Sequence, residues 1–260
     1  MSDFNQIYGP VALVTGASSG IGVAFAEELA ERGLDLVLTA RRRDRMQALA
    51  QRLEAQHGIE VRVIELDLAN PSAPAELLDQ TRDLDIGLVV SNAGFGSKGP
   101  HEGNDAANLT DMLMVNSHAP LLLSHGFLPR LRARGHGGLI LTSSVEGYFG
   151  GPYSAAYSSS KAMVIALGEA LWGEVSGSDI KVLTVCPGAT ESEAAAKQGI
   201  DPAKMRNVMP ARDVARLALD NIAEGPTYCP SEPYRAMYEG MLAMPRRDAL
   251  LAMTKGMRGG

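Results

Sequence analysis

A glycine-rich loop between a short apolar run and an amphipathic segment constrains this chain more than any other feature. Residues 11–15 (VALVT) have the pattern of a buried strand, the loop 15–22 (TGASSGIG) follows at once, and a helix is predicted over 20–32. Glycine permits a tight turn and a close approach of the backbone to a phosphate. A helix that begins there offers unpaired N–H groups and the positive end of its dipole. The loop therefore indicates a site for a nucleotide pyrophosphate, and the alternative is a plain tight turn.

The rest of the chain alternates short apolar runs with longer amphipathic segments. Apolar runs bounded by turn residues are typical of buried parallel strands, and we expect strands at 11–15, 34–40, 61–66, 86–91, 138–143 and 180–185. The segments between them predict helices over 20–32, 44–57, 74–83, about 105–133, 155–174 and 211–224. This alternation implies a doubly wound α/β fold, a parallel sheet with helices on both faces, in a single domain over residues 1–260.

Two segments depart from this alternation. Residues 192–210 fall between a strand and a helix, and they are either a lid over a site or a solvated helical excursion. The stretch from 237 onward holds five of the 12 methionines. Methionines at helical spacing favour adaptable core or interface packing, not a cofactor site.

Composition excludes several classes of function. The 24 basic and 30 acidic side chains give a formal net charge of -6 at pH 7, so no cationic excess is available for nucleic acid. No apolar run approaches the roughly 18 residues of a membrane span, and no signal peptide is evident. The two cysteines, Cys186 and Cys229, are expected to be reduced thiols of a cytoplasmic protein. The five histidines have no metal-ligand spacing, so no metal is expected.

Polar residues follow several of the predicted strands. Ligands of open α/β sheets bind at the carboxyl ends of strands, and Asp67-Leu68 and Asn92-Ala93-Gly94 lie at such ends. After the second strand stand Arg41 and Arg42, where an acid would bind the ribose hydroxyls of NAD. The Arg41 guanidinium there can hold a 2′-phosphate with bidentate bonds, and Arg42 is a second candidate for this role. The alternative is a solvated basic start of the next helix.

A tyrosine and a lysine four residues apart open the helix predicted over 155–174. Spacing i, i+4 places Tyr157 and Lys161 on one helical face. An ammonium beside a phenol lowers the phenol pKa, so Tyr157 could exchange protons near neutral pH. Ser144 follows the fifth predicted strand, and its hydroxyl can bond a substrate oxygen. Taken alone, such a Tyr–Lys pair is usually only a surface contact.

The combined motifs resemble the short-chain dehydrogenase/reductase family. They are TGASSGIG, Asn92-Ala93-Gly94, Asn116, Ser144, YSSSK at 157–161, and Cys186-Pro187-Gly188. The resemblance covers nearly the whole chain and implies a Rossmann-type domain with about seven parallel strands, the last around 226–229. It implies a cytoplasmic NADP(H)-dependent oxidoreductase that moves hydride to or from a ketone or secondary alcohol, without metal, nucleic-acid or membrane partners. A homodimer or homotetramer packed through 105–133 and 155–174 is also implied.

The same resemblance implies roles for single residues. Tyr157 would be the general acid or base, Lys161 would hold the nicotinamide ribose and lower the Tyr157 pKa, and Ser144 would steady the substrate oxygen, with Ser143 as its competitor. Asn116 would hold a water that links Lys161 to solvent. Motifs and resemblance together predict the cofactor contacts Gly16, Ser18, Ser19, Gly20, Ile21, Gly22, Arg41, Arg42, Asp67, Leu68, Asn92, Ala93, Gly94, Tyr157, Lys161, Pro187, Gly188, Thr190 and Ser192.

The substrate is less constrained. Phe95, Phe149 and Tyr153 flank the motifs and are expected as apolar walls beside Ser144, while Glu146 faces either the pocket or solvent. A mostly apolar small molecule is the hypothesis, and a pocket-facing Glu146 would repel anions. A 3-oxoacyl-thioester reductase and a hydroxysteroid dehydrogenase are both open alternatives. A non-catalytic nucleotide-binding regulator would be expected to lack the Tyr–Lys pair, and a methyltransferase would want an acid where Arg41 stands.

Overall fold

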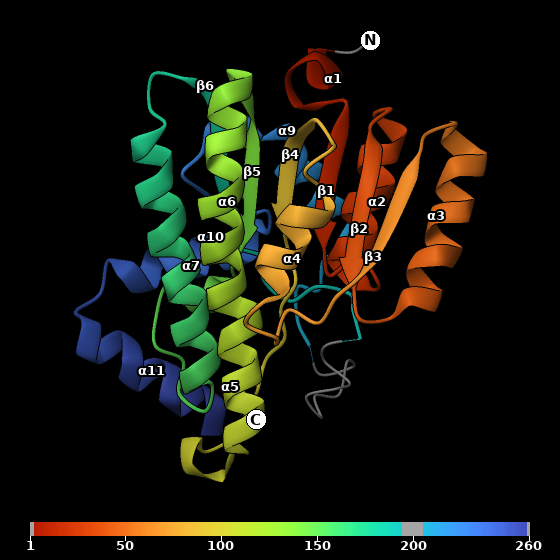
Figure 1. Ribbon diagram of the computed structural model, residues 1–260. Coiled ribbons are helices and arrows are strands. Elements are labelled where there is room, and N and C mark those ends of the chain that lie inside the picture. The colour runs from red at the N-terminus through yellow and green to blue at the C-terminus, as the bar shows by residue number, and fades with distance from the viewer. Residues whose placement is uncertain (1–2, 194–204, 259–260) are drawn as a thin grey trace.

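A seven-stranded parallel sheet forms the centre of the computed structural model, which describes residues 3–193 and 205–258. Its order is β3-β2-β1-β4-β5-β6-β7, and every neighbouring pair is parallel (Figure 1). The predicted α/β class and strand number are confirmed. The strands are β1 Val11–Thr15, β2 Asp35–Ala40, β3 Val61–Glu65, β4 Ile86–Ser91, β5 His136–Thr142, β6 Asp179–Val185 and β7 Thr227–Tyr228.

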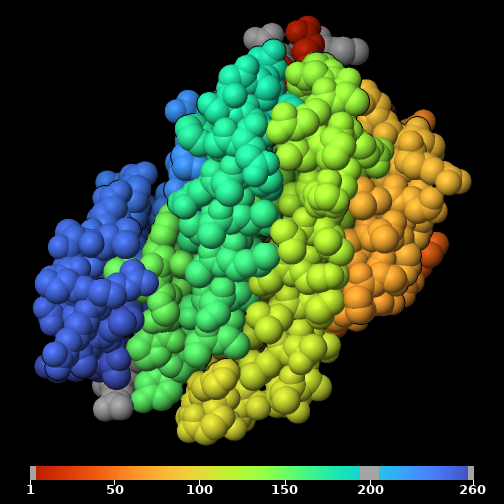
Figure 2. Space-filling model, turned by 60° about the vertical axis from the view of Figure 1, so that its left-hand side comes forward, coloured from red at the N-terminus to blue at the C-terminus, as the bar shows by residue number. Residues whose placement is uncertain are grey.

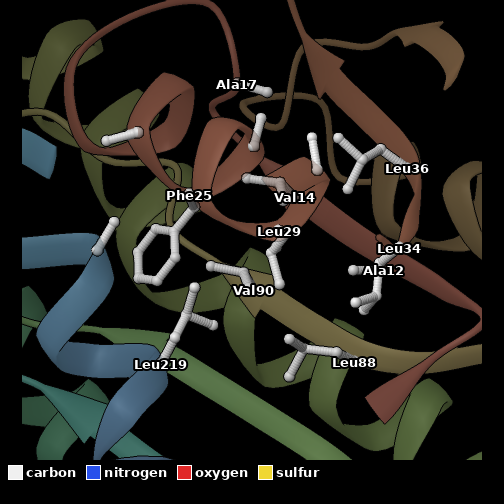
Figure 3. Packing of buried hydrophobic residues seen from close by; sticks show 14 of the residues in the cluster. Ala12, Val14, Ala17, Phe25, Leu29, Leu34, Leu36, Leu88, Val90 and Leu219 are labelled. Carbon is white, nitrogen blue, oxygen red and sulfur yellow. The ribbon is translucent and has the colours of Figure 1, made fainter. Parts of the chain in front are cut away.

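Helices cover both faces of this sheet because its central strands are apolar on both sides. Along β1, Ala12 and Val14 belong to one buried cluster and Leu13 to the other. Figure 3 shows the first cluster, in which Phe25 and Leu219 lie beside Val90. Its helices are α2 Gly20–Glu31, α3 Arg43–His57 and α9 Ala211–Asp220, and those of the opposite face are α4 Ala73–Gln80, α6 Ala119–Arg134 and α7 Ala155–Glu174.

The helix predicted over about 105–133 is interrupted. It consists of α5 (Ala106–Leu113), a π-helical turn (Met114–His118) and α6. Pro120 has no N–H to donate to the carbonyl of Asn116, four residues earlier, so the α-helical ladder cannot run through this point. The predicted helical stretch is confirmed over residues 106–134, with a π-helical turn that the sequence analysis did not predict. The π-helical turn is a feature often found at functional sites, and it contains Asn116.

Three helices were not predicted. The short α1 (Asp3–Tyr8) precedes β1, while α10 (Glu232–Leu242) and α11 (Arg246–Arg258) lie beside α7 (Figures 1 and 2). The last two cover a small separate core, where the buried members are Val145, Phe149, Cys229, Tyr238 and Ala249. Met241 and Met253 pack against it, as the methionine pattern predicted.

Two exclusions from sequence can be compared with the part of the chain that the structure describes. Within 3–193 and 205–258, no helix is both long and apolar enough to cross a membrane. Cys186 and Cys229 are both buried, and they form no disulfide, as expected for reduced thiols.

Candidate active site

The loops at the carboxyl ends of the strands surround a cavity of about 1290 Å³. Most of the residues predicted from motifs line this cavity, although they come from distant parts of the chain. They are Gly16, Ser18, Ser19, Gly20, Ile21, Arg41, Arg42, Asp67, Leu68, Asn92, Ala93, Gly94, Phe95, Ser144, Glu146, Tyr157, Lys161, Pro187, Gly188, Thr190 and Ser192.

The glycine loop is held close to the end of β4. Gly16 has φ +71, and a Cβ there would lie 2.9 Å from the Cα of Ala93. A Cβ at Gly22 would overlap the Gly16 carbonyl, so this residue shapes the loop from beneath without lining the cavity. The Thr15 hydroxyl accepts bonds of 2.9 Å from the N–H groups of Asn92 and Ala93, which ties β1 to β4. Ser19 caps α2 without a side-chain bond, so the first N–H groups of α2 suit a pyrophosphate.

In the cavity wall beside the glycine loop, Arg42 is the more firmly held of the two arginines. Its Nε lies 3.2 Å from the Ser18 hydroxyl, and its Nη2 lies 3.2 Å from the Ser18 carbonyl. The Arg41 side chain is 70% exposed, 3.7 Å from the Asp67 carboxylate. The sequence favoured Arg41 over Arg42 as the ligand of a 2′-phosphate. In the structure Arg42 is the more enclosed of the two, with 31% of its side chain exposed. A phosphate-binding role stays a prediction for both. Glu193, which sequence reasoning missed, binds Arg42 at 2.8 Å.

The segment 192–210, predicted as a lid or a helical excursion, is described only at its two ends. Residues 194–204 lie outside the described part of the chain, so neither alternative is tested there. Met209, near the end of this segment, pairs with the residues that precede it. The N–H of Glu191 donates to the Met209 carbonyl at 2.9 Å, and the N–H of Met209 donates to the Ala189 carbonyl at 3.0 Å. Met205 lines the cavity.

Tyr157, Lys161 and Ser144 line the same cavity. Lys161 is buried, and its Nζ lies 3.0 Å from the Thr142 carbonyl and 5.9 Å from the Tyr157 ring centroid. The Ser143 hydroxyl donates to the Lys161 carbonyl at 2.7 Å, and the Ser144 hydroxyl accepts from the N–H of Glu146 at 3.2 Å. Of the two serines that competed in the sequence, Ser144 is the one whose side chain acts to lower the pKa of the Tyr157 phenol.

Burial dominates the proton equilibria of these groups. It raises the pKa of the Tyr157 phenol above its ordinary value; the Glu146 carboxylate adds to this effect and the Ser144 hydrogen bond opposes it. Burial lowers the pKa of Lys161 to about 8. Desolvation is thus the largest influence on the Tyr157 pKa. The expected lowering of that pKa by Lys161 stays a prediction.

Asn116 lies behind the cavity, not on its wall. Its amide bonds the Phe95 backbone in both directions, accepting from the N–H at 3.0 Å and donating to the carbonyl at 2.9 Å. The same amide donates to the Ser160 hydroxyl at 3.0 Å. The π-helical turn thus fastens the loop after β4 to α7, while the expected water-holding role stays a prediction.

Two of the predicted substrate walls are displaced. Phe149 is 2% exposed and packs against Tyr238 beneath Arg246, and Tyr153 accepts a backbone bond from Gly99 outside the cavity lining. Helices α10 and α11 take their place, and only the methionine-rich pattern signalled them. The lining residues from these helices are Tyr234, Met237, Tyr238, Met241, Ala252, Met253 and Gly256.

Glu146 faces the cavity, but it does not stand there as a lone negative charge. Both of its carboxylate oxygens lie 2.7 Å from Nζ of Lys98, a lining residue that sequence reasoning missed. The expected repulsion of anions by Glu146 is therefore offset by its partner. Within the described ranges, no three histidine, cysteine or acidic side chains could hold a metal ion together.

A doubly wound parallel sheet with a glycine loop at its carboxyl edge defines a dinucleotide-binding protein of the Rossmann type. Residues 10–203 match the model of the short chain dehydrogenases, and the chain belongs to this family of oxidoreductases. The family binds NAD or NADP, and the cradle formed by Gly16, Gly22 and the N-terminus of α2 fits such a dinucleotide.

Individual proteins resemble the chain over most of its length. A 7beta-hydroxysteroid dehydrogenase of Clostridium sardiniense is 29% identical over 254 residues, which are 97% of both chains. An uncharacterised oxidoreductase of Mycobacterium tuberculosis is 40% identical over 193 residues, or 71% of this chain and 75% of that one. A short-chain dehydrogenase from Sphingobium yanoikuyae in complex with NADPH is 32% identical, with a TM-score of 0.82 and coverage of 96% and 95%.

Proposed function

We propose that this protein is an NADP(H)-dependent oxidoreductase of a ketone and secondary alcohol pair, with Tyr157 as its general acid and base. One observation carries the proposal. One cavity is lined both by Tyr157, Ser144 and Lys161 and by the glycine loop and Arg42. A non-catalytic nucleotide-binding regulator would have no need of a phenol, a hydroxyl and an ammonium gathered beside the cofactor cradle.

Side chains of this protein transfer the proton to or from the substrate oxygen. In reduction, the Tyr157 phenol donates its proton to the substrate oxygen while the Ser144 hydroxyl donates a hydrogen bond to the same atom. In oxidation, Tyr157 accepts the proton. A bound nicotinamide supplies or takes up the hydride. Lys161 would bind the ribose hydroxyls, and the raised pKa of Tyr157 keeps the phenol protonated at neutral pH, as reduction requires.

The preference for NADP over NAD rests on Arg42. A 2′-phosphate carries nearly two negative charges, and it must be paired when it is partly desolvated. Arg42 is half-buried beside Ser18, at the cavity wall that begins with the glycine loop. The NADPH complex of the Sphingobium yanoikuyae enzyme is in line with this preference.

We infer a bulky, mostly apolar substrate of the hydroxysteroid or polycyclic ketone class. Methionine and tyrosine side chains of α10 and α11 contribute apolar lining to the cavity that also contains Tyr157. Thioethers adapt to large irregular ligands. The 7beta-hydroxysteroid dehydrogenase relative matches over nearly the whole chain, including these helices. The 3-oxoacyl-thioester alternative is supported by a very-long-chain 3-oxoacyl-CoA reductase of Kluyveromyces lactis, which is 33% identical but matches only 67% of this chain.

The test is a substrate panel followed by the absorbance of the reduced cofactor. Keto-steroids and neutral cyclic or aryl ketones are compared with β-keto acids and 3-oxoacyl thioesters, each with NADPH and with NADH. We expect the highest kcat/KM for the neutral bulky ketones with NADPH. A clear preference for free acids or thioesters would exclude the substrate class, and binding of NADPH without any turnover would favour the regulator.

The expected homodimer or homotetramer and the single-domain organisation stay proposals. Exposed apolar side chains at Leu113, Leu121 and Trp172 lie on α5, α6 and α7, the helices expected to form the subunit contact. Figure 2 shows these helices side by side on one face of the molecule. Light scattering at several protein concentrations would measure the oligomeric state.

A further inference from the structure

A closed polar cluster stands in the cavity wall outside the Tyr157, Ser144 and Lys161 group. The Lys98 ammonium donates to both Glu146 oxygens at 2.7 Å and to the Ser154 hydroxyl at 3.0 Å. The Ser154 hydroxyl in turn donates to Glu146 at 2.7 Å. The Lys98 and Glu146 side chains are 27% and 23% exposed, and Ser154 is buried. Charges so far removed from water interact more strongly than a surface pair does.

This cluster is joined to the proposed acid and base at two points. Nζ of Lys98 lies 5.8 Å from the Tyr157 ring centroid, nearly the same distance as Nζ of Lys161 at 5.9 Å. The backbone N–H of Glu146 donates to the Ser144 hydroxyl at 3.2 Å. Two ammonium groups therefore stand near one phenol, and only Lys98 has a carboxylate partner among the ion pairs of the described residues.

We propose that Lys98 and Glu146 form a positioning pair, whose matched charges determine how readily Tyr157 gives up its proton. The inference rests on the proposed role of Tyr157. A lone Lys98 would stabilise the phenolate, and a lone Glu146 would stabilise the protonated phenol. In the paired state the Lys98 ammonium opposes the effect of the Glu146 carboxylate, which raises the Tyr157 pKa. Tyr157 thus remains a proton donor although an ammonium lies near its ring.

Other titratable groups face Tyr157 from the neighbouring elements. Lys161 stands on α7 itself, Cys186 follows β6, and Tyr238 lies on α10. Burial raises the pKa of the Cys186 thiol to about 12 and raises that of Tyr238 above its ordinary value, so both stay neutral over the working range. The charged groups that bear on the proposal are therefore Glu146, which acts on the Tyr157 pKa, and the Lys161 and Lys98 ammonium groups, which lie 5.9 and 5.8 Å from its ring centroid.

The proposal is tested by two substitutions that must act in opposite directions. Glu146→Gln leaves the Lys98 ammonium unpaired, so Tyr157 should lose its proton at a pH lower by about 1 unit. Lys98→Met leaves the Glu146 carboxylate unpaired, so the pH at which Tyr157 loses its proton should rise by about 1 unit. The double variant should return close to the wild type. The readout is the pH profile of kcat/KM for alcohol oxidation, in which Tyr157 must accept a proton.

A second readout needs neither substrate nor cofactor. Tyrosinate absorbs in the near ultraviolet, and the difference between each variant and the same variant carrying Tyr157→Phe isolates the ionisation of Tyr157. This titration tests the effect of Lys98 and Glu146 on Tyr157 even if the wild type reduces no compound of the substrate panel. Absence of activity would contradict the proposed function but not the role of this pair. A merely structural role would lower kcat without moving either titration.

Two control variants separate charge from packing. Lys98→Arg keeps the charge and should keep the wild-type profile. Lys181→Met removes a lysine near the amino end of β6, at the opposite edge of the sheet, and should change nothing. Shifts of Glu146→Gln and Lys98→Met in the same direction, or no shift in either, would overturn the proposal.

Discussion

Nη1 of Arg42 lies 2.8 Å from Oε2 of Glu193, although the two residues are separated by 151 positions in the chain. The other oxygen of the same carboxylate lies 2.5 Å from Nη1 of Arg45. Glu193 thus bridges two guanidinium groups at the start of α3, in the wall of the cavity. A carboxylate and a phosphate use the same donors, so Glu193 occupies donors that, under the proposed function, would bind the 2′-phosphate of NADP.

Replacing Arg42 with Ala should weaken NADPH binding roughly 10- to 100-fold, because hydrogen bonds between charged groups are worth about 1.5–3 kcal/mol each. The affinity for NADH should change little. Titration calorimetry with NADPH, NADH and 2′,5′-ADP measures all three affinities. Arg41→Ala is the matched control, and its smaller effect is expected from a side chain that is 70% exposed. Equal losses for NADPH and NADH would contradict a role at the 2′-phosphate.

Glu193→Gln should tighten NADPH binding by about 10-fold, the value of one charge-assisted bond that the phosphate no longer has to displace. NADH affinity should stay the same. Glu191→Gln, two residues earlier and exposed, serves as the control in the same calorimetric titration. If Glu193→Gln instead weakens NADPH binding, the carboxylate holds the two arginines in place for the phosphate and does not compete with it.

Tyr157→Phe keeps the ring and removes the acidic proton, so kcat should fall about 10²- to 10⁴-fold, the usual contribution of general acid–base catalysis. NADPH affinity should be nearly unchanged, which calorimetry on the same sample verifies. Single-turnover rates with the best ketone of the panel measure the chemical step directly. Retention of the wild-type rate would eliminate Tyr157 as the proton donor.

Local patterns predicted the strands and the glycine loop because their signals are contained within a few residues. A run such as residues 86–91 is apolar on both faces, and only a central parallel strand buries both. The loop 15–22 requires its glycines for the same backbone reasons in any chain of this fold. The motif residues that line the cavity follow directly from the topology, since parallel strands bring their carboxyl ends to one edge.

The missed features depend on contacts between distant segments. Lys98 and Glu146 are 48 positions apart, and no local sequence pattern indicates that their side chains form an ion pair. Phe149 is apolar and lies near the motifs, but α10 packs over it and contributes Tyr238 to the cavity in its place. Glu193 meets Arg42 only because β6 returns the chain to the edge beside the glycine loop. Such pairs require the tertiary structure.

Gly168→Ala should destabilise the fold by about 1–3 kcal/mol, the usual cost of overfilling a packed interior. A Cβ at Gly168 would overlap the Thr184 hydroxyl of β6, and it would lie 3.4 Å from Leu141 of β5. Thr184 is fully buried, so its side chain cannot move into solvent. Gly173→Ala, on the same helix α7, meets nothing within 4 Å and should stabilise by about 0.5–1 kcal/mol through helix propensity alone. Urea unfolding of both variants measures the two free energies. A stable Gly168→Ala protein would mean that α7, which carries Tyr157 and Lys161, does not need this close approach to the sheet.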